Sequence, residues 1–200
     1  MQNPRRHVWI AAAALALSLR AAASFAPAAP VFEPPAGAQA GDLIFRQGAE
    51  AVSQAVMAAD GGGYSHVGIL LGGPGGWQVL HATPSEVPGR PDGVVIDSLA
   101  FFAAPERSRH QGVYHVQANE PQRLLAIAHA QAQVGRTFSL TDPQAGTYCT
   151  QLVWQAWQDA GLDWQATPSH LQLPFIAGDY WLPSDLRASP RLRQLSAGPQ

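Results

Sequence analysis

The chain contains a single thiol, at a position suited to a nucleophile. Cys149 opens the segment 149–160, in which Leu152, Val153 and Ala156 recur at the spacing of one helix face. A thiol in the first turn of a helix lies near unpaired backbone N–H groups and the positive end of the helix dipole, and both favour the thiolate. A lone Cys cannot form an internal disulfide, so Cys149 is either an inert buried residue or a thiol kept for its reactivity.

A general base for this thiol is predicted in a β-hairpin that carries two of the seven histidines. The segments 65–71 and 77–82 have the composition of strands, and the Gly- and Pro-rich run 72–76 between them is typical of a turn. His66 lies near the start of the first strand, and His81 lies near the end of the second. The hairpin therefore brings both side chains to the same end of the sheet.

The register of this hairpin decides how close the two rings lie. Folding about Pro74 puts His66 opposite Ala82, or opposite His81 if the loop is one residue shorter or bulged. Opposed residues have Cβ atoms about 4.5–5.5 Å apart, near enough for one ring to orient the other. We expect Cys149 as nucleophile and His66 as general base, with His81 either as its orienting partner or as a locally satisfied strand residue.

Two further questions concern the oxyanion and metal ions. The backbone N–H of Cys149 is the expected oxyanion donor. Tyr64 is a second candidate by its proximity to His66, and a ring packed at a strand end is the alternative interpretation. The other histidines of the domain show no paired ligand spacing, so we expect no metal and no cofactor; they are His110, His115, His129 and His170.

Three sequence motifs, taken together, resemble a known family. They are GDLIF at 41–45, YSHVGI at 64–69 and YCTQLVW at 148–154, and LPSDL at 182–186 follows them. In content and order these motifs resemble the permuted papain-like hydrolases related to the NlpC cell-wall peptidases, in the YiiX-like branch. The resemblance covers about residues 41–157 and implies an α/β fold of the α+β type, a circularly permuted papain-like fold with an antiparallel sheet packed against helices.

The resemblance also assigns roles to the site residues and exposes a departure. Cys149 matches the nucleophile of the family, and His66 matches its base. The third member in the family is commonly Glu on the next strand, where this chain has His81. A neutral imidazole can orient His66 but cannot offset its positive charge as a carboxylate does. The resemblance therefore leaves two alternatives: a Cys-His-His triad, or the participation of a carboxylate such as Glu86, for which a solvated loop position is the other interpretation.

Composition shifts along the chain predict its domain organisation. Residues 1–23 resemble a signal peptide, with Arg5 and Arg6 before a short apolar run and a small-residue cleavage site; a permanent N-terminal anchor is the alternative. Residues 24–40 form a Pro- and Ala-rich linker or strap, 41–190 the hydrolase domain and 191–200 a flexible tail. We expect cleavage after Ala23, no stable membrane span after processing, and a periplasmic or secreted location.

Within the domain, hydrophobic spacing predicts helices over 48–59, 119–134 and 149–160. Asn119 and Gln122 form a capping box for the second of these helices. Strands are expected at 42–45, 65–71, 77–82, 93–96 and 112–117, and irregular structure after Asp163, where prolines recur.

The overall charge is close to balanced and excludes one class of partner. The chain has 12 Lys and Arg against 14 Asp and Glu, with no basic stripe, so nucleic acid is not expected to bind. We expect hydrolysis of an amide or peptide bond, with murein peptides as the substrate implied by the resemblance and by export. The alternatives are a lipid-directed acyl hydrolase or acyltransferase of the same fold, and a non-catalytic binding module.

Overall fold

The structure is a computed structural model that describes residues 32–72, 76–142, 144–174 and 176–196. Residues Val31–Gln200 belong to one compact unit. The expected signal peptide, 1–23, and the first part of the expected linker lie outside the described residues. Among the described residues, no helix is both long enough and apolar enough to cross a membrane.

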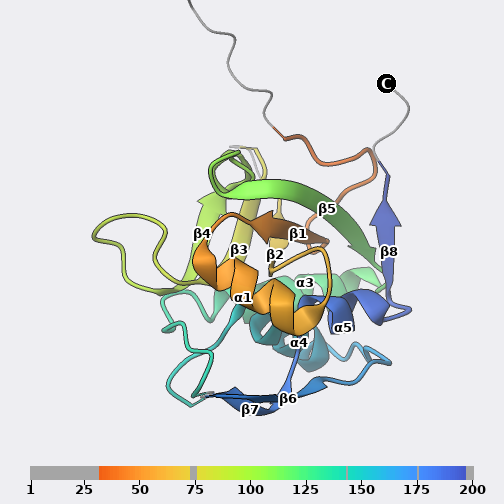
Figure 1. The fold of residues 1–200 in the computed structure, drawn as a ribbon. Coiled ribbons are helices and arrows are strands. Elements are labelled where there is room, and N and C mark those ends of the chain that lie inside the picture. The colour runs from red at the N-terminus through yellow and green to blue at the C-terminus, as the bar shows by residue number, and fades with distance from the viewer. Residues whose placement is uncertain (1–31, 73–75, 143, 175, 197–200) are drawn as a thin grey trace, which may run out of the picture. The chain divides into compact units, whose positions relative to one another are not determined.

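An antiparallel sheet of six strands forms the framework of this unit (Figure 1). Its strand order is β4-β3-β2-β1-β5-β8, so the segments that carry the expected site residues, β2 and β3, are neighbours. The strands are β1 (Leu43–Gly48), β2 (His66–Leu71), β3 (Gln78–Thr83), β4 (Gly93–Ser98), β5 (Ser108–Val116) and β8 (Leu192–Leu195).

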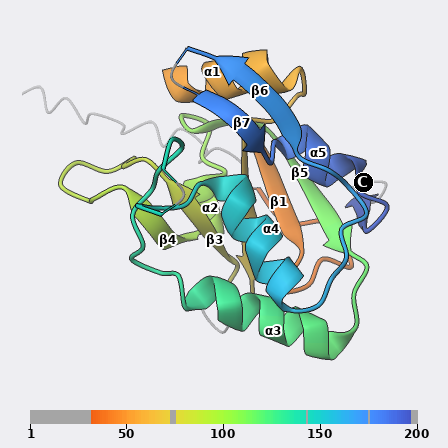
Figure 2. The same ribbon diagram turned by 90° about the horizontal axis from the view of Figure 1, so that it is seen from below.

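Two helices cover one face of the sheet, as Figure 2 shows. Helix α4 (Cys149–Asp159) packs on β2 and β3, and α3 (Glu120–Gln131) packs on α4 from outside. The buried side of α4 carries Leu152, Val153 and Trp157, which join the sheet residues in the larger core cluster. Because α4 has one continuous apolar face, its first residue is fixed above the sheet.

The opposite face of the sheet has a smaller core. Ile44, Leu70 and Val79 pack there against the short helix α2 (Leu99–Phe102). Phe32 and Ala38 pack on the same cluster, so the described part of the expected linker lies against the domain as a strap.

The GDLIF motif joins the start of β1 to β5 and α3. The carboxylate of Asp42, which is fully buried, accepts hydrogen bonds from the N–H of Val116 and from Arg123, at 3.2 and 3.1 Å. Gly41 has φ +92, and a Cβ there would lie 2.8 Å from Cγ of Arg123, so this position requires glycine. The motif therefore has a structural role and lies apart from the thiol.

The C-terminal third differs from the expected irregular structure. It contains a two-stranded sheet, β6 (Ser169–Leu173) with β7 (Ile176–Tyr180), then α5 (Pro183–Ala188) and β8. Prolines are compatible with these elements because Pro174 lies at the turn and Pro183 in the first turn of α5. Strand β8 pairs with β5, so the expectation of a flexible tail is wrong for Leu192–Leu195.

The β2–β3 hairpin also differs from its expected register by one residue. Ile69 pairs with Leu80 and Leu71 with Gln78, whereas folding about Pro74 predicted that Leu71 faces Trp77. Continued along both strands, the observed register puts His66 opposite Thr83 rather than Ala82 or His81. Thr83 and His81 are two residues apart and share a face, so His66 and His81 remain diagonal neighbours.

Candidate active site

The start of α4 holds Cys149 against β2. The two sequence neighbours of Cys149 both form hydrogen bonds with the backbone of Trp181. The N–H of Trp181 donates to the Tyr148 hydroxyl at 3.1 Å, and the carbonyl of Trp181 accepts from the Thr150 hydroxyl at 2.5 Å. The backbone of Val67, the residue after His66, lies close enough to the thiol to lower its pKa. These contacts fix the first turn of α4 beside the start of β2.

The two expected histidines are in direct contact. Nε2 of His66 lies 2.8 Å from Nδ1 of His81, and both side chains are buried. Phe102 packs against both rings, with its centroid 5.6 Å from that of His66 and 5.1 Å from that of His81. His66 lines the same cleft as Cys149, although no hydrogen bond joins the two side chains among the described residues. A catalytic hydrogen bond of this kind often tightens only when substrate binds.

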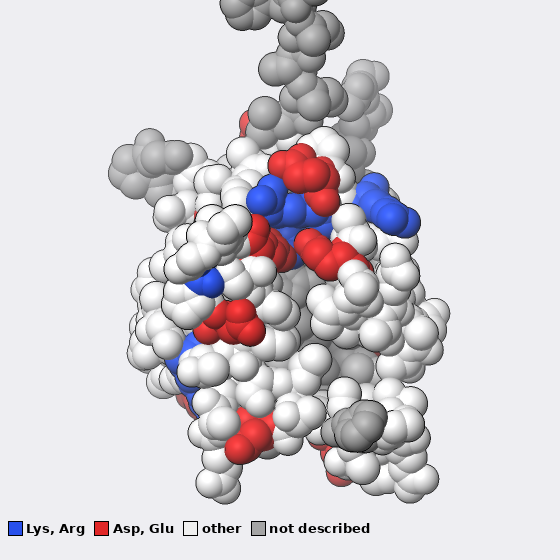
Figure 3. Space-filling model, turned by 60° about the vertical axis from the view of Figure 1, so that its left-hand side comes forward, with Lys and Arg blue, Asp and Glu red and all other residues white. Residues whose placement is uncertain are grey.

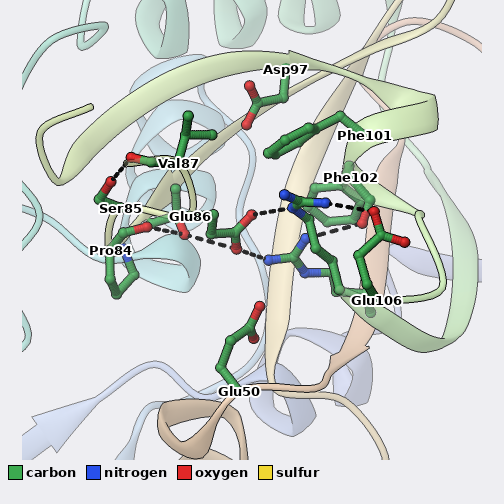
Figure 4. Close-up of polar contacts among 12 residues, drawn as sticks. Glu50, Pro84, Ser85, Glu86, Val87, Asp97, Phe101, Phe102 and Glu106 are labelled. Carbon is green, nitrogen blue, oxygen red and sulfur yellow. Dashed lines mark hydrogen bonds and ion pairs between the residues drawn. The ribbon is translucent and has the colours of Figure 1, made fainter. Parts of the chain in front are cut away.

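The expected alternative, Glu86, takes a different place. Its carboxylate is only 8% exposed and forms an ion pair with the buried guanidinium of Arg46. It also accepts from the hydroxyl of Thr83 at 3.2 Å, and Figure 4 shows it directed toward guanidinium groups. Glu86 forms no hydrogen bond with either histidine. It is therefore neither a solvated surface residue nor the direct partner of His66.

A carboxylate that the sequence analysis did not select stands behind His81. Asp97, near the end of β4, has Oδ2 3.1 Å from Nε2 of His81, and its Oδ1 accepts from Arg90 at 2.7 Å. The alternation of side chains between the two faces of β4 could have identified Asp97. His81 pairs with Val95, and Asp97 follows two residues later on the same face. The predicted strand ended at Ile96, one residue too early to include it.

Burial leaves the thiol and its expected base neutral. Burial raises the pKa of Cys149 above its ordinary 9.0, although hydrogen bonds from Val67 and Thr150 and the charge of Arg46 act in the opposite direction. Burial, together with the charge of Arg46, holds the pKa of His66 well below 6.5. Loss of solvation therefore opposes the expected effect of the helix start on the thiol.

Two cavities meet at Cys149. The first, of about 220 Å³, has a mixed lining, in which Arg46, Glu86 and His66 lie beside apolar side chains that include Val56 and Phe138. The second, of about 130 Å³, lies between α1 (Ala51–Asp60) and the β6–β7 hairpin and is lined mainly by apolar side chains. Figure 3 shows acidic and basic groups gathered beside a hollow on one face of the molecule.

Tyr64 does not join this cleft. Its ring packs in the core against Phe45 and Tyr114, and its hydroxyl lies 3.2 Å from Nε2 of His110. Tyr64 is not among the residues that line either cavity at Cys149. A structural role, as a ring packed at the end of a strand, therefore fits Tyr64 better than the role of oxyanion donor. The N–H of Cys149 remains a candidate donor, because the first residue of a helix has no intrahelical acceptor.

The described residues contain no group of three or more His, Cys, Asp or Glu side chains that could hold a metal ion. The chemistry available at this site is that of the thiol, the two imidazoles and the carboxylate behind them. A helix that begins with Cys, packed on an antiparallel sheet whose strands carry His66 and His81, defines a papain-like hydrolase in which His precedes Cys.

Comparison with protein families agrees with this class and specifies the family. The chain belongs to the permuted papain-like amidases of the YaeF/YiiX type, the C92 family, whose model matches residues 37–190. A similar solved structure is that of the metalloprotein YiiX from Escherichia coli O157:H7, with a TM-score of 0.66 and 18% sequence identity. The match covers 83% of this chain and 98% of that one. No curated protein sequence matches the chain significantly.

Proposed function

We propose that this chain is a cysteine-dependent amidase that transfers an acyl group to water. The observation that carries the proposal is that His66, which contacts His81, lines the same cleft as Cys149. In the first step the Cys149 Sγ attacks the carbonyl carbon while its proton passes to His66. The resting pair is neutral, so the proton moves as the S–C bond forms rather than beforehand.

The later steps follow from the same groups. The imidazolium of His66 gives its proton to the leaving amine as the C–N bond breaks, which leaves a thioester on Cys149. Water then attacks the thioester with His66 again as base, and the acid product leaves. The N–H of Cys149 stabilises the oxyanion that forms in both halves of the reaction.

For the substrate we propose an amide bond in a murein peptide. This part rests on the family resemblance and on the expected export, since a fold hosts many functions. The first cavity supports it, because Glu50, which is only partly buried, lines this cavity and can bind an amino group of such a peptide. Glu50 lines the same cavity as His66, which protonates the leaving group.

A lipid-directed acyl hydrolase or acyltransferase is the second candidate, and the apolar cavity favours it. Val56, Leu171, Ile176 and Trp181 line that cavity, but His66 does not. Because His66 must protonate the leaving group, the acyl side of the substrate points into the apolar cavity. An apolar cavity of about 150 Å³ can hold benzene, so one of similar size suits a short acyl chain or an aliphatic side chain.

Assays of the purified chain on muropeptides and on phospholipids decide between the two candidates. We expect turnover of muropeptides that is lost in both Cys149→Ala and His66→Ala. Turnover of phospholipids alone would support the lipid-directed function instead. Absence of turnover on both substrates, with Cys149→Ala binding them as the parent does, would identify a non-catalytic module instead.

We also propose that the chain is exported and that the mature protein begins near Ser24. The proposal rests on the positive start, the short apolar run and the small residues at 21–23. N-terminal sequencing of the protein from the periplasmic or secreted fraction is the test. Intact Met1 on membrane-bound protein would support the permanent anchor.

A further inference from the structure

A continuous line of hydrogen bonds connects the proposed base to a carboxylate on a third strand. It runs from His66 on β2 through His81 on β3 to Asp97 on β4, with separations of 2.8 and 3.1 Å. The middle ring, His81, is fully buried, and the side chain of Asp97 is 11% exposed. Arg90 holds the other oxygen of Asp97 at 2.7 Å. His81 and Asp97 therefore each have one defined neighbour on either side.

We propose that Asp97 is a positioning residue that sets the proton pattern of both imidazoles and so keeps Nδ1 of His66 free to accept the thiol proton. This inference rests on the proposed function only in the role given to His66. Asp97 substitutes at a distance for the carboxylate that the family commonly has at the position of His81.

The proton pattern follows from the donors and acceptors along the line. An ionised carboxylate can only accept, so the proton of His81 must lie on Nε2, the atom that faces Asp97. A neutral imidazole carries one N–H, so Nδ1 of His81 is an acceptor. The atom that faces it, Nε2 of His66, must then be the donor. The one arrangement that satisfies every contact leaves Nδ1 of His66 without a proton.

The charges around the line keep it in this state. Burial lowers the pKa of His81 below 6.5 and the charge of Arg46 acts in the same direction, against the opposing effects of Asp97 and Glu86, so His81 is neutral near pH 7. Burial alone would raise the pKa of Asp97, but hydrogen bonds from His81 and Arg90 outweigh it, and the pKa falls below its ordinary 3.8. The carboxylate is therefore ionised and the ring beside it neutral, as the pattern requires.

The same line supports the base after it has reacted. When the thiol proton moves to Nδ1 of His66, the S–H bond breaks, an N–H bond forms and the electron pair stays on sulfur. His66 then carries a positive charge, and its Nε2–H bond to His81 becomes charge-assisted and stronger. His81 needs no change of tautomer in this step because its Nδ1 already accepts.

Substitution of Asp97 by Asn tests the assignment. The carboxamide of Asn can donate to Nε2 of His81, which reverses the line and puts the proton of His66 on Nδ1, where it blocks acceptance of the thiol proton. We expect kcat to fall at least about tenfold, and up to about 10⁴-fold as for a base held in the wrong tautomer. KM should stay within about twofold, because Asp97 lines neither cavity at Cys149.

A matched control variant and a second-site variant distinguish an effect of Asp97 on the proton pattern from an effect on stability alone. Asp92→Asn removes a carboxylate of the β3–β4 loop that lies outside the line and accepts from the N–H of Ser85 at 2.8 Å, and it should leave kcat unchanged. In a His81→Glu background, the new carboxylate accepts from His66 directly, so adding Asp97→Asn should no longer lower kcat. An equal loss in both backgrounds would show that Asp97 acts only on stability and would overturn the inference.

A spectroscopic measurement decides the inference even without turnover. The ¹⁵N shifts of His66 in the Cys149→Ala protein report which ring nitrogen carries the proton. We expect the proton on Nε2 in this protein and on Nδ1 after the further change Asp97→Asn. Protonation of Nδ1 before that change would refute the role of Asp97, whereas persistence of turnover in Cys149→Ala would refute the proposed function alone.

Discussion

At the scale of single residues, burial favours the neutral forms of the thiol and both imidazoles in the site. His66 lies beside Arg46 and His81, and its pKa is held well below 6.5. Since only the unprotonated ring can accept the thiol proton, kcat/KM should stay constant as pH falls through 6.5 and decline only well below it. A pH–rate profile on the preferred substrate measures this. An acid limb centred at or above 6.5 would contradict the buried, neutral base.

The thiol should show the complementary behaviour. Burial raises the pKa of Cys149 above 9.0, and the thiolate is the form that reacts with iodoacetamide. Alkylation of the native protein should therefore have its midpoint at a higher pH than alkylation of the denatured chain, in which the thiol is exposed to water. A native midpoint below that of the denatured chain would indicate a preformed thiolate–imidazolium pair instead.

The sequence predicted three of the four residues in this arrangement. The single Cys, the hairpin and the family resemblance together selected Cys149, His66 and His81, and the structure brings the two histidines into contact. Asp97 was missed because it acts through a second pair of strands, and the extent of β4 was needed to place it on the face of His81. The pKa directions were also beyond the sequence, because they depend on the depth at which each group is buried.

At the scale of elements, the contact between β2 and β3 sets the geometry of the histidines. Gly68 lies two residues after His66, and a Cβ there would come within 2.4 Å of Cγ1 of Val79 and 3.2 Å of Cβ of His81. Gly68→Ala should therefore force β3 away, lower the free energy of unfolding by about 1–3 kcal/mol and reduce kcat.

Gly72→Ala is the matched control for this prediction. A Cβ at Gly72 would meet no atom closer than 3.9 Å, so stability and kcat should change little. Chemical denaturation and steady-state kinetics on both variants provide the comparison. If Gly68→Ala kept the parent kcat, the spacing of the two strands would not control the alignment of His81 with His66.

Among the elements, those with strong periodicity or caps could be predicted and the others could not. The capping box of Asn119 and Gln122 is present at the start of α3. The C-terminal elements gave a weak signal because their stability depends on distant contacts. Asp185, for example, caps α5 through the N–H of Leu182 at 2.9 Å and also accepts from the hydroxyl of Ser169 at 2.8 Å. Such contacts follow from tertiary structure rather than from local composition.

At the scale of the whole molecule, the same burial that tunes the site links folding to pH. His66 and His81 have lower pKa values in the folded chain than in the unfolded chain, where the ordinary value is 6.5. Below pH 6.5 the unfolded chain therefore binds more protons than the folded chain at these positions. Their contribution to stability is complete above pH 6.5 and is lost as the pH falls toward the folded-state values.

This linkage predicts that His66 and His81 lower the free energy of unfolding as the pH falls. The free energy of unfolding, from denaturant titrations at about pH 7.5 and about pH 5, should be smaller at the lower pH. In His66→Gln the decrease should be smaller than in the parent, because Gln cannot bind the proton that the unfolded chain takes up. His170→Gln, at a side chain that is 60% exposed on β6, should retain the full decrease. If both variants showed the same pH dependence as the parent, His66 would not be held neutral by the fold, and the neutral thiol–imidazole pair would have to be abandoned.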